Sequence, residues 1–292
     1  MSDADSAFGE PQPSLISLRS SIFNYQFENG RRYHSMSEGK YAYPNDDHHI
    51  WLITLDGELA CNPAKHLAKR VLDMGTGTGV WAIDFGKSSM HIQVIGVDLS
   101  AIQPQYLPSN CSFEIDDLEK DWRWSHPFDF IFCRAMAGSW SDFPSIIQAV
   151  YDNLNPGGYF EIQDLELPMC CPDGTISADS AIWRWHRVVV EAAAEMGRPL
   201  DYVPKSIPHL ERAGFTEITH RVFKWPFNSW PRHPKLQEIG RWHCHNLEMG
   251  LEALSMALLT RVKGWDPADV TALCEEVKKE VRDTNMHGYW NM

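Results

Sequence analysis

The chain of 292 residues lacks several patterns that would assign it to other classes of protein. It has no run of about 18 apolar residues, so the sequence predicts no membrane-spanning helix. The first residues, MSDADSAFGEPQPS, are acidic and polar and do not resemble a secretory signal peptide. The seven cysteines form no CxxC pair, which argues against common zinc and redox motifs and favours a reducing compartment. We therefore expect a soluble, cytoplasmic protein.

Positive charge is also scarce. The formal net charge is -13, and no basic run is longer than a pair such as Arg31-Arg32. Binding to nucleic acid or to an anionic membrane needs clustered positive charge, so we expect neither as a partner. Hydrophobic residues make up 43% of the chain, which is ample for a packed core. A small molecule is the partner that this composition favours, and a homodimer is left open.

The order of apolar and polar segments predicts an α/β fold. Residues 1–20 are rich in Ser, Asp and Pro and are expected to be disordered, leaving 21–292 as a single domain. From residue 69, short apolar strands alternate with helical patterns, which is typical of βαβ units in a mostly parallel sheet flanked by helices. The following segments, 170–200 and 235–285, are mainly helical and are predicted to form a lid. In the second of these, Asp266-Pro267 is a good helix start.

The stretch RVLDMGTGTG, which ends at Gly79, places three glycines directly after the first of these strands. A glycine loop between a strand and a helix lets backbone N–H groups approach a ligand closely, although such a loop is often an ordinary turn. The spacing is GxGxG, whereas dinucleotide-binding loops have GxGxxG. Asp73, two residues before the first glycine, would repel a pyrophosphate. It suits a cationic ligand, such as one that carries an amino group and a sulfonium.

Two further acids follow the next two predicted strands. Asp98, nineteen residues past Gly79, can accept both hydroxyl groups of a ribose. Asp117 can accept from an exocyclic amine, while Leu118 offers its backbone N–H. The three acids together predict sites for an amino-acid end, a ribose and an adenine.

Five ordered motifs over residues 69–165 resemble those of class I methyltransferases that use S-adenosylmethionine: VLDMGTGTGVWAIDF, GVDLS, FEIDDLEKDW, FDFIFCRAM and LNPGGYFEIQD. The upstream segment ENGRRYHSMSEGKYAYPNDD and the downstream GRPL and GWDPADV resemble the fungal methyltransferases related to the regulator LaeA. Many of those enzymes methylate small natural products. The resemblance implies a Rossmann-like fold, with residues 69–165 as its cofactor-binding core, and S-adenosylmethionine as the cofactor.

The resemblance also implies which positions hold the cofactor. The glycine loop and its leading acid would line the methionine part, the later acids would hold ribose and adenine, and an arginine after the fourth strand would close the pocket. An upstream tyrosine, with Gly39 and Tyr41 beside it, would cover the amino-acid end. The predicted cofactor-binding residues are Tyr33, Asp73, Gly75, Gly77, Asp98, Leu99, Asp117, Leu118 and Arg134.

One feature departs from the family pattern. Class I domains usually end with a strand inserted antiparallel between the fifth and sixth strands. Here the predicted helix over 267–283 is followed by only HGYWNM after a short turn. We therefore expect the final antiparallel strand to be short or missing.

The acceptor is less well defined by the sequence. A general base is needed where an alcohol or phenol must lose its proton early, and His186, between Trp183 and Trp185, is the predicted catalytic residue. His243 and His245 are further candidates, but their spacing points them apart in a helix, so no metal site is expected. Three functions stay open: methylation of O, N or S of a hydrophobic natural product, a LaeA-like regulator acting through protein partners, and a cyclisation or rearrangement without methylation.

Overall fold

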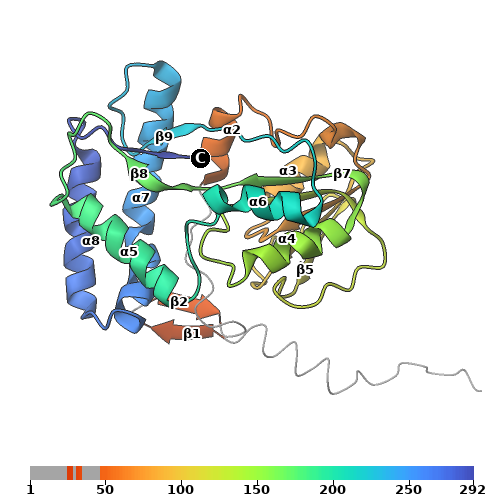
Figure 1. Cartoon of the computed structure of the whole chain (residues 1–292), viewed down its shortest axis with the longest axis horizontal. Coiled ribbons are helices and arrows are strands. Elements are labelled where there is room, and N and C mark those ends of the chain that lie inside the picture. The colour runs from red at the N-terminus through yellow and green to blue at the C-terminus, as the bar shows by residue number, and fades with distance from the viewer. Residues whose placement is uncertain (1–24, 29–30, 35–46) are drawn as a thin grey trace, which may run out of the picture.

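The computed structural model describes residues 25–28, 31–34 and 47–292 (Figure 1). The disorder predicted for residues 1–20 therefore concerns residues outside this description. The first elements are the strands β1 (Tyr25–Glu28) and β2 (Arg31–His34), which pair antiparallel, and the helix α2 (Asp47–Thr54). A single 3-10 turn, η1 (Lys65–Leu67), precedes the main sheet.

The predicted parallel sheet is confirmed. Its five strands run in the order β5-β4-β3-β6-β7, and every neighbouring pair is parallel. Because all five strands are parallel, their carboxyl ends meet at one edge, and the strand order reverses between the neighbours β3 and β6. The strands are β3 (Arg70–Met74), β4 (Gln93–Asp98), β5 (Cys111–Ile115), β6 (Phe128–Arg134) and β7 (Leu154–Gln163).

Alternating side chains of the strands build two hydrophobic layers. Phe130 and Phe132 of β6 pack on one face with Trp81 of α3 (Val80–Ser88). Ile131 and Cys133 lie in the core on the other face, which also contains the buried side chains of α4 (Phe143–Asp152). Helix α6 (Val203–Ala213) packs next to α4. The near-continuous apolar strand FDFIF is therefore buried on both faces, as a central parallel strand should be.

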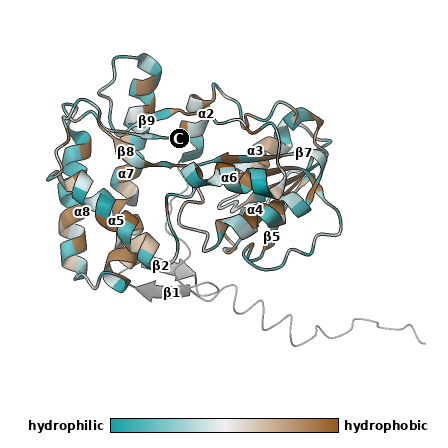
Figure 2. Cartoon of the chain, in the orientation of Figure 1, coloured by the Kyte–Doolittle hydropathy of each residue, from teal (hydrophilic) through white to brown (hydrophobic). Residues whose placement is uncertain are grey.

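A group of helices stands beside the sheet, at the left of Figure 1. It consists of α5 (Ala181–Glu195), α7 (Pro234–Arg261) and α8 (Pro267–Arg282), which contact one another, while α2 also packs on α7. Figure 2 shows hydrophobic and hydrophilic residues alternating along these helices, as amphipathic packing requires. Within the described part of the chain, no helix combines the length and apolar character needed to cross a membrane.

The final antiparallel strand is present and short. Strand β10 (Tyr289–Asn291) lies between β8 (Glu166–Cys170) and β9 (Lys224–Pro226) and is antiparallel to both. Figure 1 shows β8 extending from the end of β7 toward the helices. The inserted strand thus pairs beyond the end of the parallel sheet, next to the helical group.

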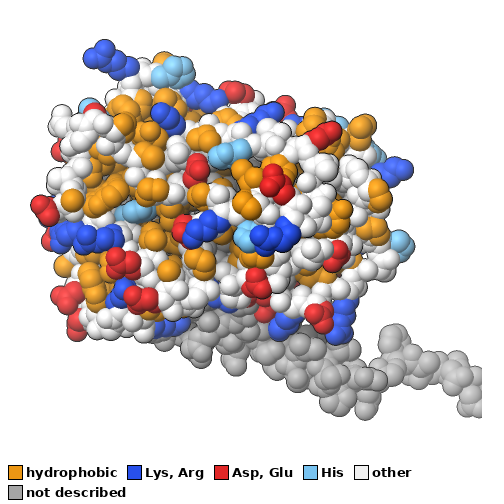
Figure 3. Space-filling view, viewed as in Figure 1, with side chains coloured by type: hydrophobic (Ala, Val, Ile, Leu, Met, Phe, Trp, Pro, Cys, Tyr) orange, Lys and Arg blue, Asp and Glu red, His pale blue; other side chains and the backbone are white. Residues whose placement is uncertain are grey.

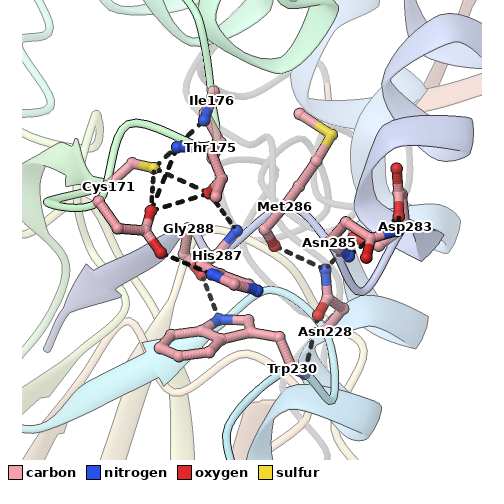
Figure 4. A network of polar contacts seen from close by, with 11 residues as sticks. Cys171, Thr175, Ile176, Asn228, Trp230, Asp283, Asn285, Met286, His287 and Gly288 are labelled. Atoms are coloured by element: carbon pink, nitrogen blue, oxygen red, sulfur yellow. Dashed lines mark hydrogen bonds and ion pairs between the residues drawn. The ribbon is translucent and has the colours of Figure 1, made fainter.

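Polar contacts fasten the segment before β10 (Figure 4). The Nδ2 of Asn228, a buried residue, donates to the carbonyls of Asp283 and Met286 at 3.0 and 3.2 Å. His287 Nδ1 lies 2.6 Å from an oxygen of Asp173, and this contact holds the pKa of the Asp173 carboxyl well below its usual range. The short strand is therefore anchored from two sides by the loops around it.

The helix start predicted at Asp266-Pro267 is confirmed, and it allows a stability test. Asp266 has an extended backbone conformation and its carboxylate accepts the backbone N–H of Ala268 at 2.8 Å. Asp266→Ala should lower the free energy of unfolding by about 1 kcal/mol, because an N–H of the first turn loses its partner. Chemical denaturation measures this change. Asp121→Ala, in an exposed loop, is the control, and an equal effect of both substitutions would contradict the capping role.

Candidate active site

The glycine loop forms a tight bend between β3 and α3. Gly75, Gly77 and Gly79 have φ values of 66°, 56° and 80°, a backbone region that other residues seldom adopt. A Cβ added at Gly75 would lie 2.1 Å from the Sδ of Met136, and one at Gly79 would lie 2.2 Å from the ring of Phe113. The loop is therefore packed so closely that its backbone itself is the surface offered to a ligand.

Two of the predicted acids flank this loop. Asp73, the last residue but one of β3, has 3% of its surface exposed and accepts the hydroxyl of Thr76 at 2.5 Å. Its burial raises the pKa of this carboxyl to about 7. Asp98 ends β4 and accepts the backbone N–H groups of Gly77 and Ser100 at 2.7 and 2.9 Å. Asp98 thus connects the end of the second strand to the glycine loop.

The third acid lies after β5. One oxygen of Asp117 accepts the N–H of Glu119 at 3.1 Å, and the other lies 3.9 Å from the ammonium of Lys120. Leu118 is buried, and its carbonyl accepts the indole N–H of Trp122 at 2.9 Å. These contacts fix the turn that presents an acid next to an apolar side chain.

Arg134 closes the opposite side. Its guanidinium donates to the side chain of Gln163 at 2.9 and 2.6 Å and to the carbonyl of Leu59 at 3.2 Å. A further N–H donates to Nδ1 of His48 at 3.2 Å. Burial lowers the pKa of Arg134 to about 10 while Asp73 opposes the shift, so the side chain is cationic at neutral pH. A cation and an acid therefore face the same space.

A single cavity joins these groups, and the space within it together with the adjoining open solvent measures about 1070 Å³. The side chains of this cavity fit S-adenosylmethionine. Asp73 suits the cationic end of that molecule, Asp98 and Asp117 can accept hydrogen bonds from its hydroxyl and amine groups, and apolar side chains line the wall. The cavity is lined by the predicted residues Asp73, Gly75, Gly77, Asp98, Leu99, Asp117, Leu118 and Arg134. Tyr33 lies in β2, whose side chains are outside the described part of the chain, as are Gly39 and Tyr41. Their role in binding stays a prediction.

Asp47 and Met136 also line the cavity, although the motifs did not assign them to it. Asp47 comes from α2, far upstream, so only the folded chain brings it to the site. No group of three His, Cys, Asp or Glu side chains is placed to hold a metal ion in the residues that the structure describes.

A second, larger cavity adjoins the first. Its empty volume is about 1500 Å³, and it shares Asp47, Ala135 and Ser139 with the first cavity. It lies between the sheet edge and the helices α5 and α7, and apolar side chains dominate its walls. Among the residues that line it are Leu165, Leu167, Val189, Leu247, Leu254 and Leu258. A hydrophobic molecule bound here would border the amino-acid end of the first cavity.

His186, the predicted catalytic residue, lines this second cavity from α5. Burial lowers the pKa of its imidazole to about 4, so the ring is neutral. Its Nε2 accepts the backbone N–H of Met169 at 3.4 Å. The structure thus places His186 in the wall of the second cavity, with one ring nitrogen hydrogen-bonded to the backbone of Met169. Its catalytic role stays a prediction.

The sequence motifs missed a buried acid, Asp164, that also lines the second cavity. Its carboxylate accepts the hydroxyl of Tyr202 at 2.5 Å and the N–H of Met136 at 2.6 Å. Burial raises its pKa to about 6. Because Met136 lies over the glycine loop, Asp164 fixes the wall where the two cavities meet.

Comparisons with known proteins agree with this geometry. A family model described as "Methyltransferase domain" matches residues 51–217. The chain is 38% identical to methyltransferase pytC of Aspergillus terreus, covering 99% of this chain and 92% of the relative. It is 36% identical to the secondary metabolism regulator LAE1 of Cochliobolus heterostrophus, covering 92% of each, and 31% identical to the probable methyltransferase tdiE of Emericella nidulans, covering 83% and 76%.

Proposed function

The chain belongs to the methyltransferase domain family and is an S-adenosylmethionine-dependent methyltransferase, and we propose that it methylates O, N or S of a small hydrophobic or aromatic natural product. Its relatives pytC and tdiE are fungal methyltransferases. The observation that carries the proposal is the second, apolar cavity, which shares three lining residues with the first. We call the first the cofactor cavity and the second the acceptor cavity. A cavity lined mainly by apolar side chains suits a flat apolar acceptor.

The residues of the site have distinct tasks. S-adenosylmethionine supplies an activated methyl group, so the protein mainly aligns the acceptor and excludes water. Asp73 and Arg134 would hold the amino-acid end by charge, while Asp98 and Asp117 would hold the ribose and adenine by hydrogen bonds. Apolar side chains such as that of Leu254 would contact the acceptor and exclude water from its nucleophilic atom.

We also propose that the protein acts in the cytoplasm without nucleic acid or a membrane as partner. Its net charge of -13 supports this, and on the face in Figure 3 the Lys and Arg side chains are interspersed with acids. The alternative is a regulator that works through protein partners, in the nucleus, as the similarity to LAE1 suggests. Recovery of stable protein partners in a pull-down, together with no methyl transfer, would favour that alternative.

The test of the proposed function is transfer of a labelled methyl group. The protein is incubated with methyl-labelled S-adenosylmethionine and a panel of flat phenols, thiols and amines, and the organic products are analysed by mass spectrometry. We expect label on at least one acceptor. The variant Ala257→Phe, which fills part of the apolar cavity from α7, should lower this transfer and leave cofactor affinity unchanged. Absence of transfer to every acceptor would contradict the proposal.

A further inference from the structure

A row of cation and aromatic groups leads from the cofactor cavity into the acceptor cavity. The guanidinium of Arg134 lies 5.2 Å from the ring of Trp51, and Trp51 packs 5.1 Å from Trp225. The next ring is that of His243, 5.4 Å from Trp225. Trp225 and His243 line the acceptor cavity. His243 is therefore the first histidine of the acceptor cavity along this row.

The same row continues to the other histidine. His243 lies 5.5 Å from the ring of Trp290, and Trp290 lies 6.2 Å from His186. His186 is thus two rings further along the row from Arg134 than His243. Its Nε2 already accepts the N–H of Met169, so its lone pair has a partner.

A hydrogen bond sets which nitrogen of His243 carries the proton. Its Nδ1 lies 3.1 Å from the carbonyl oxygen of Pro226. Since a carbonyl can only accept, Nδ1 carries the hydrogen and Nε2 carries the lone pair of the neutral ring. Burial lowers the pKa of His243 to about 4, which keeps this neutral form at neutral pH. The ring is thus held as a hydrogen-bond acceptor, as a group that takes up a proton must be.

One turn further along α7, Asn246 shows how this part of the helix lies relative to the two cavities. Its Nδ2 donates to Asp47 at 2.9 Å, and Asp47 lines both cavities. This bond places the His243 side of α7 next to the opening between them. The Oδ1 of Asn246 is buried and is without a hydrogen-bond partner in the described structure. A buried acceptor without a partner is unfavourable, and a donor group of a bound molecule would offset that cost.

Asp164 is, with Asp47, an acid in this cavity wall. Its oxygens already accept the hydroxyl of Tyr202 and the N–H groups of Met136 and Leu165. These donors favour the ionised form and hold it in place, so Asp164 positions the wall between the cavities.

We infer that His243 is the general base of the acceptor site and that the acceptor group is a hydroxyl of a phenol or enol. The inference rests on the proposed methyl transfer. The hydroxyl proton goes to Nε2 of His243 as the hydroxyl oxygen bonds to the methyl carbon. The carbon–sulfur bond breaks, its electron pair stays on sulfur, and Nε2 later gives the proton to water. One positive charge is lost at sulfur and one appears on the imidazole, so the number of positive charges in the buried site does not change.

Two surrogate acceptors separate a base from a merely structural residue. 2-Naphthol must lose a proton, whereas 2-naphthalenethiol is far more acidic and needs little help. His243→Phe keeps an aromatic ring between Trp225 and Trp290 and removes both nitrogens. It should lower kcat/KM for 2-naphthol at least about 100-fold and change that for the thiol by less than about threefold, with the affinity for S-adenosylmethionine unchanged. His243→Gln, which keeps a donor for the Pro226 carbonyl, is the second variant if the first folds poorly.

His245→Ala, on the exposed side of the same helix, is the matched control and should leave both rates unchanged. Equal losses on both acceptors, no loss on either, or a selective loss in His186→Gln instead of the His243 variants would overturn the inference. Binding gives a readout that does not depend on turnover. In the S-adenosylhomocysteine complex, His243→Phe should weaken 2-naphthol about tenfold and hardly change 2-methoxynaphthalene, which lacks the hydroxyl.

The two proposals fail differently. If the wild type transfers no methyl group to any acceptor of the panel, the proposed function is contradicted, and with it the role of His243 as a base. If the wild type methylates 2-naphthalenethiol but not 2-naphthol, methyl transfer stands and the hydroxyl specificity is overturned.

Discussion

Replacement of Asp98 by alanine is expected to weaken binding of S-adenosylmethionine by more than tenfold, about 1.5–3 kcal/mol for the loss of hydrogen bonds to a charged group. Two effects add. The carboxylate is predicted to accept from the ribose, and it also accepts the N–H groups of Gly77 and Ser100 at 2.7 and 2.9 Å. Without it, the glycine loop loses a contact that fixes its position. Isothermal titration calorimetry measures the change directly.

The design separates the two effects. Asp98→Asn keeps one acceptor for the loop N–H groups and removes the charge, so it should bind the cofactor with an affinity between those of the wild type and Asp98→Ala. Asp121→Ala removes an exposed acid that does not line the cavity and is the control. Unchanged affinity in Asp98→Ala would contradict the assignment of the ribose site, whereas a loss equal to that of Asp121→Ala would indicate a general charge effect.

Much of the cofactor cavity could be predicted because its residues follow the strand pattern. In a parallel sheet the carboxyl ends of neighbouring strands meet at one edge, so acids at the ends of successive strands must lie near one another. Asp98 and Arg134 end their strands and Asp73 is the last residue but one of its strand, so the chain order alone predicts that they lie together. The parallel strand order therefore accounts both for the confirmed fold and for the cavity that these residues line together.

The acceptor cavity could not be predicted in this way. His243, Trp225 and Trp290 come from a long helix and two strands of three residues each, and no local pattern shows that they pack together. The last strand of the sheet is also interrupted, because β7 ends at Gln163 and β8 begins only at Glu166. The break lies at Asp164, whose buried carboxylate accepts the hydroxyl of Tyr202, 38 residues later in the chain. The local pattern of apolar residues does not reveal a partner so distant in the sequence.

Binding of S-adenosylmethionine should depend on pH through Asp73. Burial raises the pKa of this carboxyl to about 7, so in the unliganded protein it is mostly protonated at pH 5.5 and mostly ionised at pH 7.5. Only the ionised form attracts the cationic end of the ligand. Affinity should therefore rise with pH, about tenfold from pH 5.5 to pH 7.5, and fall again above about pH 8, where an α-amino group loses its proton.

Asp73→Asn tests the origin of this dependence. The amide retains an acceptor for the hydroxyl of Thr76, which lies 2.5 Å from the carboxylate, but it cannot ionise. The variant should bind the cofactor weakly at every pH and show no rise between pH 5.5 and 7.5. Because Asp164, with a pKa raised to about 6, titrates in the same window, Asp164→Asn is titrated in parallel and should keep the rise. A rise that persists in Asp73→Asn and disappears in Asp164→Asn would transfer the effect to the acceptor cavity and remove Asp73 from the binding of the cationic end.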